Sequence, residues 1–496
     1  MTTDDSSTTT VAGVTVSTDH WIGGRRVSSA ERFEDISPID ERVIARVARG
    51  TASDAEAAVA AARDAFPAWA TTPPAERARL LHRIADLVEE RIEQLAIVET
   101  TDNGALLRSH LRGVMPRVAH NFRFFADYLV EHLQHPDFDT RGHRNHVSWD
   151  PSGVAALITP WNAPLMLATW KVAPALAAGC TVVLKPAEWS PLTASLLADI
   201  TAEAGLAPGV FNVVQGLGEE VGPALTGHPD VSRISFTGSV PTARLIAAAA
   251  APNLTPCSFE LGGKSPFIVF ADTDMESAVV NAVEQYDNAG QVCLAGVRLL
   301  VESSIRDEFV ERFVARATGL RQGDPRDLTT DIGPQVSREH FERVDGFVQR
   351  AIADGARPVI GGGPNTDLGG LYYHPTLFTD ARPGSEILTQ EVFGPVLTLQ
   401  TFDTEDEAVD LANGTEFGLA AVLFTGDPDR AERVSARLVA GTVWTNCFFV
   451  RDLRAPFGGS RHSGVGREGG TWSFDFYCDV KNSCTNLERW TVTTAR

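Results

Sequence analysis

The sequence predicts an α/β protein that is built on parallel β-sheets and divided into at least two domains. At 496 residues the chain exceeds the size at which a single hydrophobic core normally stops growing. From about residue 153, short apolar runs with strand character alternate with helical stretches, and the alternation restarts after about residue 260. A repeated alternation of this kind is typical of two α/β domains that follow one another.

The first part of the chain contains a tail and two predicted helices. Residues 1–17, which begin MTTDDSSTTT, are polar, and we expect them to be disordered. A capping box of Ser53 and Glu56 predicts the start of one helix. Thr72 with Pro73 predicts the start of a second.

Four apolar runs follow, namely GVAALIT, TVVLKP, FNVVQG and RISFTG, and helical stretches separate them. One such stretch runs from Pro191 to Ala204 and ends at Gly205. Strands that are buried on both faces read as continuous apolar runs, so these four predict a parallel sheet. Their spacing suits a nucleotide-binding domain.

The second domain begins with the run SPFIVF, the helical DMESAVVNAVEQYDN and the run VRLLVE. Further helices are predicted near 304–320 and 337–354, and further strands near 396–402 and 418–425. At the end of the chain, FYCDVKNSCTN alternates polar and apolar residues like a strand. Such a strand can pair with another subunit.

Charge and composition exclude several classes of partner. Lys and Arg number 43 against 64 Asp and Glu, which gives a formal charge of −21 and a field that repels nucleic acids and anionic membranes. No run approaches the roughly 20 apolar residues that cross a bilayer. The N-terminus lacks the features of a secretory signal, so we expect a cytoplasmic protein with neither nucleic-acid nor membrane partners.

The six cysteines show neither CxxC spacing nor the density of a secreted domain, and we interpret them as reduced thiols. His135, His143 and His146 come closest to a metal-binding cluster, in HPDFDTRGHRNH. Their spacing fits no zinc pattern, so we interpret this stretch as a solvated loop and expect no metal site.

Three residues have the chemistry of an acyl-transfer site. Cys293, in NAGQVCLAG, follows a helix that we expect to end at Gly290, and a loop cysteine can be a nucleophile or a packed thiol. Glu260 precedes two glycines in FELGGKSP, where a carboxylate can point into a cavity. Asn162, in ITPWNAPL, can donate to an oxyanion, although a turn beside two prolines is the more ordinary role.

Several loops after predicted strands suit a nucleotide. Gly216 to Gly222, GLGEEVG, follows a strand but lacks the dinucleotide fingerprint, so it indicates phosphate and no more. Lys185 and Glu188, in VLKPAEWSP, suit a phosphate or ribose and a ribose diol. Gly238 and Ser239 close the FTGS strand, where the next helix starts.

Lysine is rare in this chain, which uses arginine as its usual cation. The four lysines are Lys171, Lys185, Lys264 and Lys481, and the first three lie in stretches that are already notable. A compact ammonium is not replaceable by a planar guanidinium at a tight site, which favours specific roles for these three.

Seven motifs in order resemble the aldehyde dehydrogenase superfamily: TPWN, LKPAEWSP, FTGS, ELGGKSP, GQVCLAG, EVFGPV and PFGGSRHSGVGREGG. The resemblance covers nearly the whole chain and implies that family's fold, with a Rossmann-like cofactor domain, an α/β catalytic domain and a small β oligomerisation element. The implied division is 18–130 with 151–259 for NAD binding, 260–446 for catalysis, 131–150 with 471–496 for oligomerisation, and 447–470 for the substrate tunnel and return segment.

The resemblance implies that Cys293 attacks the aldehyde carbon as a thiolate and that the Asn162 amide and the Cys293 backbone N–H hold the oxyanion. Hydride then passes to the nicotinamide, and Glu260 activates water to hydrolyse the thioester. Glu188 binds the 2′-hydroxyl and repels a 2′-phosphate, so NAD is favoured over NADP. The family positions expected at the cofactor are Thr159, Pro160, Trp161, Lys185, Glu188, Gly218, Gly222, Phe236, Gly238, Ser239, Leu261, Glu391 and Phe393.

The substrate pocket is expected to contain Arg117, Trp170, Arg451 and Phe457. The segments around both arginines are similar to those of the 2-hydroxymuconate and 5-carboxymethyl-2-hydroxymuconate semialdehyde dehydrogenases. A guanidinium in an apolar tunnel needs an anionic partner, which a carboxylated semialdehyde from aromatic ring cleavage would supply.

Alternatives remain open for both the pocket and the reaction. Arg451 can instead pair with Asp452, and Arg117 with a neighbouring carboxylate; the small Ala163 leaves room for a bulkier neutral aromatic, terpenoid or aliphatic aldehyde. A CoA-acylating dehydrogenase and a catalytically silent relative are remoter alternatives. The implied assembly is a homodimer or homotetramer.

Overall fold

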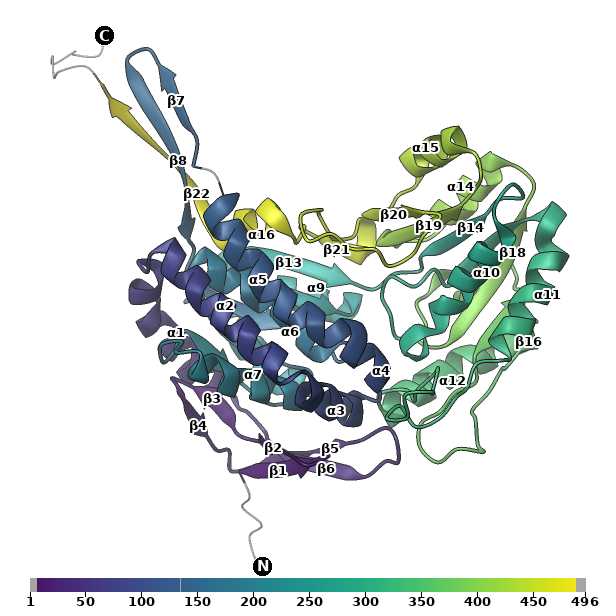
Figure 1. Ribbon diagram of the computed structural model, residues 1–496, viewed down its shortest axis with the longest axis horizontal. Helices are drawn as coiled ribbons and strands as arrows, with labels where there is room; N and C mark the ends of the chain where they lie inside the picture. The colour runs from purple at the N-terminus through teal and green to yellow at the C-terminus, as the bar shows by residue number, and fades with distance from the viewer. Residues whose placement is uncertain (1–6, 134, 488–496) are drawn as a thin grey trace, which may run out of the picture.

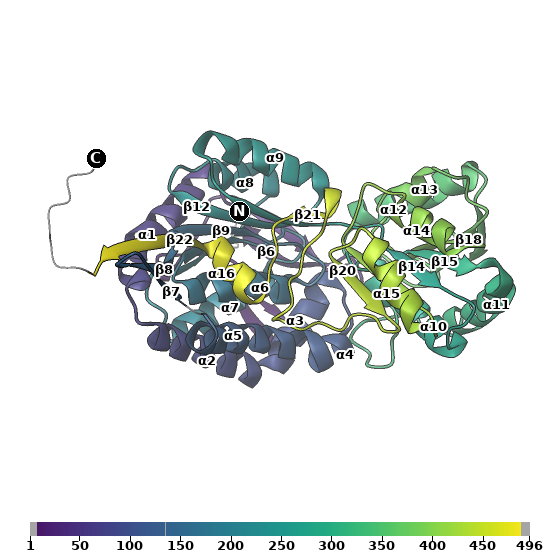
Figure 2. The same ribbon diagram turned by 90° about the horizontal axis from the view of Figure 1, so that it is seen from above.

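The computed structural model describes residues 7–133 and 135–487, and it consists of two α/β bodies that lie side by side (Figure 1). The first body, purple to teal in the figure, holds an eight-stranded sheet, and the second, in green, a seven-stranded sheet. A three-stranded sheet projects from the first body. The C-terminal segment, in yellow, crosses from the second body back over the first (Figure 2). Among the described residues, no helix combines the length and apolar character needed to traverse a bilayer.

The sheet of the first body has the strand order β21-β13-β12-β9-β10-β11-β3-β4. Its five central strands are parallel: β13 (Cys257–Leu261), β12 (Val231–Gly238), β9 (Val154–Ile158), β10 (Thr181–Lys185) and β11 (Phe211–Val213). The outer strands are β21 (Gly464–Val465), β3 (His20–Ile22) and β4 (Arg25–Val27). The parallel sheet predicted from the four apolar runs is confirmed.

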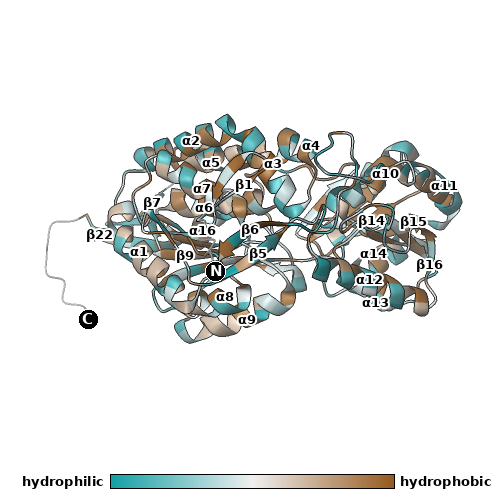
Figure 3. Ribbon diagram, turned by 90° about the horizontal axis from the view of Figure 1, so that it is seen from below, coloured by the Kyte–Doolittle hydropathy of each residue, from teal (hydrophilic) through white to brown (hydrophobic). Residues whose placement is uncertain are grey.

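Helices cover both faces of this sheet, so successive strand residues are buried in different clusters. In β9, Val154 and Ala156 pack with one group of helices, and Ala155 and Leu157 with the other. The first group is α1 (Ala52–Ala70), α8 (Gly218–Thr226) and α9 (Val240–Ala250). The second is α2 (Pro74–Glu90), α3 (Ile92–Asn103), α5 (Met115–Glu131), α6 (Pro164–Ala178) and α7 (Leu192–Glu203). Figure 3 shows the hydrophobic colouring in the strands and on helix sides turned toward them.

The second sheet has the order β16-β17-β18-β15-β14-β19-β20, with β16 as an antiparallel edge. Its strands are β16 (Arg357–Ile360), β17 (Thr376–Thr379), β18 (Val396–Phe402), β15 (Arg298–Glu302), β14 (Pro266–Val269), β19 (Ala420–Phe424) and β20 (Thr442–Thr445). Its helices are α10 (Met275–Val283), α11 (Arg306–Ala317), α12 (Arg338–Ala353), α13 (Glu386–Thr389), α14 (Glu405–Asn413) and α15 (Pro428–Arg437). Phe267 and Ile268 of β14 again face different clusters.

The prediction that residues 1–17 are disordered is wrong for the part that the structure describes. Residues 8–17 form an antiparallel hairpin of β1 (Thr8–Val11) and β2 (Val14–Ser17). Val11 and Val16 are buried, and they pack with Val47 of β6 (Val43–Ala48). Strand β6 pairs with β5 (Arg32–Ile36). Two buried valines in a short polar segment are too weak a signal to predict this docking.

The first helix begins earlier than predicted. Its N-cap is Thr51, and the backbone N–H of Thr51 donates to the Asp54 carboxylate at 2.8 Å. The box at Ser53 and Glu56 has the same spacing, but burial of Ala55 against the sheet places the helix start at Thr51. The second helix has Pro73 as its N-cap.

Two domain boundaries and one predicted loop differ from those expected. Strand β13 runs to Leu261, so a boundary at 260 divides a strand of the first sheet. Helix α16 (Gly470–Tyr477) packs in the core of the first body and is no part of the projecting sheet. The stretch with His143 and His146 is not a loop, because β8 (His143–Pro151) pairs with β7 (Asp137–Thr140) and, along nine residues, with β22 (Cys478–Asn486).

Candidate active site

Cys293 lies in the loop between the two sheets' adjoining edges, after helix α10 and before β15. The backbone before it takes left-handed values at Asn288, Ala289 and Gly290, with φ of 49°, 54° and 74°. Two non-glycine residues in this region need support from their surroundings. The amide of Gln335 supplies part of it by donating to the Ala289 carbonyl at 3.1 Å.

The Asn162 side chain is attached to this loop. Its Nδ2 donates to the carbonyl of Gln291 at 3.0 Å, and Asn288 Nδ2 donates to the carbonyl of Asn162 at 2.9 Å. A primary amide has two N–H donors, so the bond to Gln291 fixes the orientation of the amide and leaves the second N–H for a ligand. Asn162 therefore has the geometry of an oxyanion donor next to Cys293. Sequence reasoning missed Asn288 and Gln291, although both amides flank the cysteine in NAGQVC.

Glu260 is buried on β13, and neither of its carboxylate oxygens has a hydrogen-bond partner among the described residues. Gly458 approaches it so closely that a Cβ there would lie 2.8 Å from Oε1. Burial raises the pKa of Glu260 well above its usual value, and the Glu468 carboxylate raises it further. A buried carboxyl with free oxygens and a raised pKa is suited to general-base catalysis.

The thiol of Cys293 is electrostatically linked to these groups. Burial raises the pKa of Cys293 to about 12, with further contributions from Glu391 and Glu260, while Arg451 acts to lower it. The thiol is therefore protonated at neutral pH in the protein without ligands. Cys293 and Glu260, which are 33 positions apart in the sequence, belong to one site.

A buried ion pair lies beside Glu260. Lys171 Nζ donates to Glu468 Oε1 at 2.7 Å and to Ser235 Oγ at 2.8 Å. Lys171 is completely buried and Glu468 nearly so. Sequence reasoning noted Lys171 only for the rarity of lysine and missed Glu468, although Glu468 stands in the quoted motif PFGGSRHSGVGREGG.

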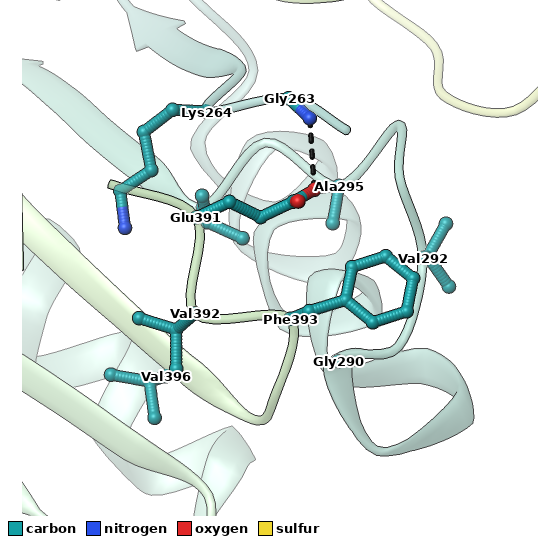
Figure 4. A pocket seen from close by; sticks show the side chains of 10 residues that line it. Gly263, Lys264, Gly290, Val292, Ala295, Glu391, Val392, Phe393 and Val396 are labelled. Atoms are coloured by element: carbon teal, nitrogen blue, oxygen red, sulfur yellow. Dashed lines mark hydrogen bonds between the residues drawn. The ribbon is translucent and has the colours of Figure 1, made fainter. Parts of the chain in front are cut away.

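Glu391 lies against the two glycines that follow Glu260 (Figure 4). It accepts a hydrogen bond from the Gly263 backbone N–H at 2.8 Å, and a Cβ at Gly262 would lie 2.0 Å from Oε2. Burial raises the pKa of Glu391 to about 7. These glycines therefore leave room for a carboxylate close to the Cys293 loop.

The segment from Glu391 to Phe393 is held by helix α12. Arg343 donates to the carbonyls of Val392 and Glu391 at 2.6 and 2.8 Å, and His340 Nε2 lies 2.7 Å from the Phe393 carbonyl. These contacts support the left-handed φ of 62° at Phe393. Neither His340 nor Arg343 was predicted.

The ring of Trp161, in the first body, contacts the Phe393 ring of the second body, and both are candidate cofactor residues. Its centroid is 5.3 Å from Phe393, 4.9 Å from His340 and 5.8 Å from Trp189. Trp161 follows β9 at its carboxyl end, which is where ligands bind in open parallel sheets. The aromatic cluster thus joins the edge of the first sheet to the Glu391 segment.

Lys185 and Glu188 lie at the same edge of the first sheet. Lys185 ends β10, and its Nζ donates to Glu188 Oε2 at 2.9 Å. A Cβ on Gly218, the first residue of α8, would lie 4.0 Å from both side chains. Ser239 caps α9 by accepting from the Thr242 N–H at 3.3 Å, directly after β12 ends at Gly238.

For the remaining expected cofactor residues, the structure explains the residue type at some positions and not at others. Thr159 donates its backbone N–H to the Lys185 carbonyl at 3.1 Å, so the ends of β9 and β10 are joined. The Phe236 ring fills the space beside Gly238, where a Cβ would lie 2.4 Å from it. Leu261 is buried at the end of β13. Gly222 has no atom near the position of a Cβ, so the structure gives no reason for glycine there.

Arg451 lies against two aromatic rings and not against a carboxylate. Its Cζ is 3.8 Å from the centroid of Phe457 and 4.6 Å from that of Trp170. Within the described residues its Nη2 is buried without a hydrogen-bond partner. Asp452, the alternative partner, is bound by Arg454 at 2.6 Å. The pairing of Arg451 with Asp452 is therefore wrong.

Arg117, on α5, is half-buried and acts electrostatically on Arg451. The pKa of Arg451 is lowered to about 10, mainly by burial and in part by the charge of Arg117, while the Glu260 and Glu468 carboxylates act to raise it. Across the described part of the chain, Arg117 has no ion pair either. Both guanidinium groups remain charged at neutral pH, and neither forms an ion pair with a described residue.

The three notable lysines are all buried, but in different surroundings. Lys171 is paired with Glu468 and Lys185 with Glu188, whereas Lys264 Nζ has no partner among the described residues. Burial lowers the pKa of Lys264 to about 7. Figure 4 shows its side chain directed away from the Glu391 carboxylate.

Comparison with known proteins agrees with this geometry. Residues 26–483 match the aldehyde dehydrogenase family. The chain is 45% identical to 2-hydroxymuconic semialdehyde dehydrogenase of Pseudomonas sp. (strain CF600) over 94% of this chain and 99% of that protein. It is 42% identical to 2-aminomuconic semialdehyde dehydrogenase of Danio rerio, over 94% and 97%. The crystal structure of an indole-3-acetaldehyde dehydrogenase with NAD+ superposes with a TM-score of 0.93 at 39% identity, covering 96% and 97% of the two chains.

The chain belongs to the aldehyde dehydrogenase family. It is accordingly an oxidoreductase that converts an aldehyde to a carboxylic acid, as the order of its seven motifs predicts.

Proposed function

We propose that this enzyme oxidises a carboxylated semialdehyde to the corresponding dicarboxylic acid with NAD as hydride acceptor. The observation that carries the substrate class is the Arg451 guanidinium, which is in contact with aromatic rings and lacks an anionic partner within the described residues. Leaving such a charge uncompensated is costly. A substrate carboxylate offers the bidentate partner that a guanidinium fits best.

The chemistry rests on Cys293, Asn162 and Glu260. The thiolate of Cys293 attacks the aldehyde carbon, and the free N–H of Asn162 donates to the oxygen as it becomes anionic. When bound, NAD would supply the acceptor for the hydride that leaves this carbon. The carbonyl then reforms as a thioester of Cys293, and Glu260 takes a proton from the water that hydrolyses it. A buried base with free oxygens favours hydrolysis over transfer of the acyl group to CoA.

The residues at the edge of the first sheet fit NAD. The Lys185 and Glu188 pair lies beside Gly218 at the start of α8, and Ser239 is the N-cap of α9. Lys185 binds only one oxygen of Glu188, so the carboxylate can also accept from a ribose hydroxyl. A 2′-phosphate would meet this negative charge, which favours NAD over NADP. Glu391 and Phe393 would face the nicotinamide, and the Glu391 carboxylate acts on the pKa of Cys293.

Relatives support the same substrate class, because they include enzymes named for 2-hydroxymuconic and 2-aminomuconic semialdehydes. The test is NADH formation with 2-hydroxymuconate semialdehyde and its carboxymethyl analogue, beside benzaldehyde, citral and hexanal. We expect kcat/KM to be far higher for the carboxylated pair. Preference for a neutral aldehyde would overturn the substrate class and leave the Cys293 chemistry intact.

We also propose that the enzyme is a homodimer or homotetramer. Strand β22 is exposed along eight of its nine residues, and Val480 and Phe138 expose 55% and 57% of their surface on the projecting sheet. A two-sided exposed sheet of this kind is a favourable surface for another subunit.

A further inference from the structure

We propose that Trp170 and Phe457 are positioning residues that hold the Arg451 guanidinium by cation–π contact so that its N–H donors remain free for the substrate carboxylate. This proposal rests on the proposed function, since it explains how the carboxylate receptor is kept in place. Neither aromatic ring needs to touch the reacting carbon for this role. We call the two rings, Trp170 and Phe457, the aromatic corner.

The geometry of the aromatic corner fits this role. The two rings are nearly perpendicular, with an interplanar angle of 82° and centroids 6.2 Å apart. The guanidinium carbon lies 3.8 Å from the Phe457 centroid and 4.6 Å from the Trp170 centroid. Both distances are well within the 6 Å range at which an aromatic face attracts a cation. Both rings are almost completely buried.

The aromatic corner also replaces the usual way of fixing an arginine. Most arginines in this protein are bound to carboxylates, as Arg454 is to Asp452. Arg451 has no such bond among the described residues, and its buried Nη2 is unpartnered. A carboxylate would occupy the donors that the substrate needs, whereas a ring face attracts the cation without using any N–H.

The two rings are held at a fixed spacing by the elements behind them. Trp170 precedes Lys171 on α6, and Phe457 exchanges two backbone hydrogen bonds with Glu468, at 2.8 and 2.7 Å. The buried Lys171 and Glu468 ion pair, at 2.7 Å, therefore connects the element that carries one ring to the segment that carries the other. The aromatic corner is thus built into the frame of the protein and does not depend on a mobile side chain.

The experiment replaces Phe457 by phenylalanines with one, two and three ring fluorines in the full-length enzyme. Fluorine withdraws electron density from the ring face and weakens its attraction for a cation, while the shape of the ring changes little. We expect kcat/KM for 2-hydroxymuconate semialdehyde to fall stepwise, by about tenfold at the third fluorine. The value for hexanal should stay within about twofold, because a neutral aldehyde does not need the guanidinium.

Phe313, on α11 of the second body, provides the matched control. Its buried ring stacks on Phe309 at 6.1 Å, and in the described residues no cation lies over it. The same fluorinated series at Phe313 should leave both substrates unchanged. A parallel fall for both substrates in the Phe457 series would show that this ring only lines the tunnel, and no fall would equally overturn the aromatic corner.

Arg451→Leu separates failure of this inference from failure of the proposed function. If Arg451→Leu spares the carboxylated substrate, the carboxylate receptor itself is wrong, and the aromatic corner with it. If Arg451→Leu weakens that substrate strongly but the Phe457 series is flat, only the aromatic corner is wrong.

Discussion

Among the buried groups of the site that lack partners within the described residues, three differ in chemical type: the Glu260 carboxylate, the Arg451 Nη2 and the Lys264 amine. A folded protein rarely leaves buried polar atoms unsatisfied, and those that it leaves usually have a ligand or a function. Glu260 and Arg451 both act on the pKa of Cys293, so their charges lie close enough to affect the thiol.

The thiol chemistry of Cys293 should show its electrostatic surroundings directly. Since burial raises its pKa to about 12, the thiolate fraction is small at neutral pH and grows with every step toward that value. We expect the rate of alkylation by iodoacetamide in the cofactor-free enzyme to rise about tenfold per pH unit from roughly pH 7 to pH 10. Peptide mass spectrometry would follow Cys293 separately from the other five cysteines. A plateau below about pH 8 would contradict the raised pKa.

Glu260→Gln should uncouple the two halves of the reaction. The amide keeps the size of the side chain but cannot accept a proton from water, so hydrolysis of the thioester should slow by roughly 10²- to 10⁴-fold. Stopped-flow measurement should show a burst of NADH close to one per active site, followed by a slow steady state. Cys293→Ala is the control and should give no burst. Loss of the burst in Glu260→Gln would assign Glu260 to an earlier step.

At the residue scale, the sequence was sufficient where a motif contains the functional residue and insufficient where the partner comes from elsewhere. Cys293, Glu260 and Asn162 stand in motifs and meet in the structure. Glu468 and His340 act through contacts with residues far away in sequence, and nothing in their own windows indicates those contacts.

At the scale of elements, helix α6 connects several functions. It begins two residues after Asn162, carries Trp170 of the proposed substrate pocket and carries Lys171 in the ion pair beside Glu260. Trp170 contacts Arg451, whereas the adjacent Lys171 pairs with Glu468. Helix α6 is therefore in contact with the return segment through both residues.

Lys171→Met should destabilise the protein through this connection. Removal of one partner leaves Glu468 as an uncompensated buried charge, which costs about 3 kcal/mol or more of the free energy of unfolding. Urea denaturation would measure the loss. The double variant Lys171→Met with Glu468→Leu should recover much of it, because no buried charge remains. If the double variant is as unstable as the sum of the single changes, the ion pair does not account for the effect.

Helices and strands were predictable from the sequence where a continuous apolar run forms them. They were less predictable where contacts with distant parts of the chain determine the structure. The four apolar runs of the first sheet all form strands. The hairpin at residues 8–17 and the strand that contains His143 and His146 depend on docking partners far along the chain, Val47 in one case and β22 in the other. A polar window alone does not show such a partner.

At the scale of the whole molecule, the two large sheets and the projecting sheet carry different groups of candidate functional residues. The ends of the first sheet's strands carry the candidate cofactor residues, the second body carries Cys293, and the return segment carries Arg451 and Phe457. The proposed reaction site lies where these three parts meet. The projecting sheet is distant from this meeting point in Figure 1.

Val480→Asp should weaken assembly without harming the site. The side chain is 55% exposed on β22, so the folded subunit has room for a carboxylate there. Burial of that charge in a subunit interface would be unfavourable. Sedimentation velocity should show a lower mass than for the unaltered enzyme, and Lys481→Gln on the same strand serves as a control for altered charge. An unchanged mass would place the interface elsewhere.

The placement of Arg451 deep in a protein with a formal charge of −21 also determines how an anion arrives. Far from the surface, a carboxylated aldehyde meets net repulsion, and only within about one Debye length of the mouth do the two unpaired arginines attract it. Added salt screens the long-range repulsion more than the short-range attraction. The encounter should therefore quicken as ionic strength rises, so that kcat/KM for the carboxylated substrate grows between about 10 and 200 mM salt. The molecule would in this way admit anions best in a salty medium, the reverse of enzymes that steer them with a positive surface.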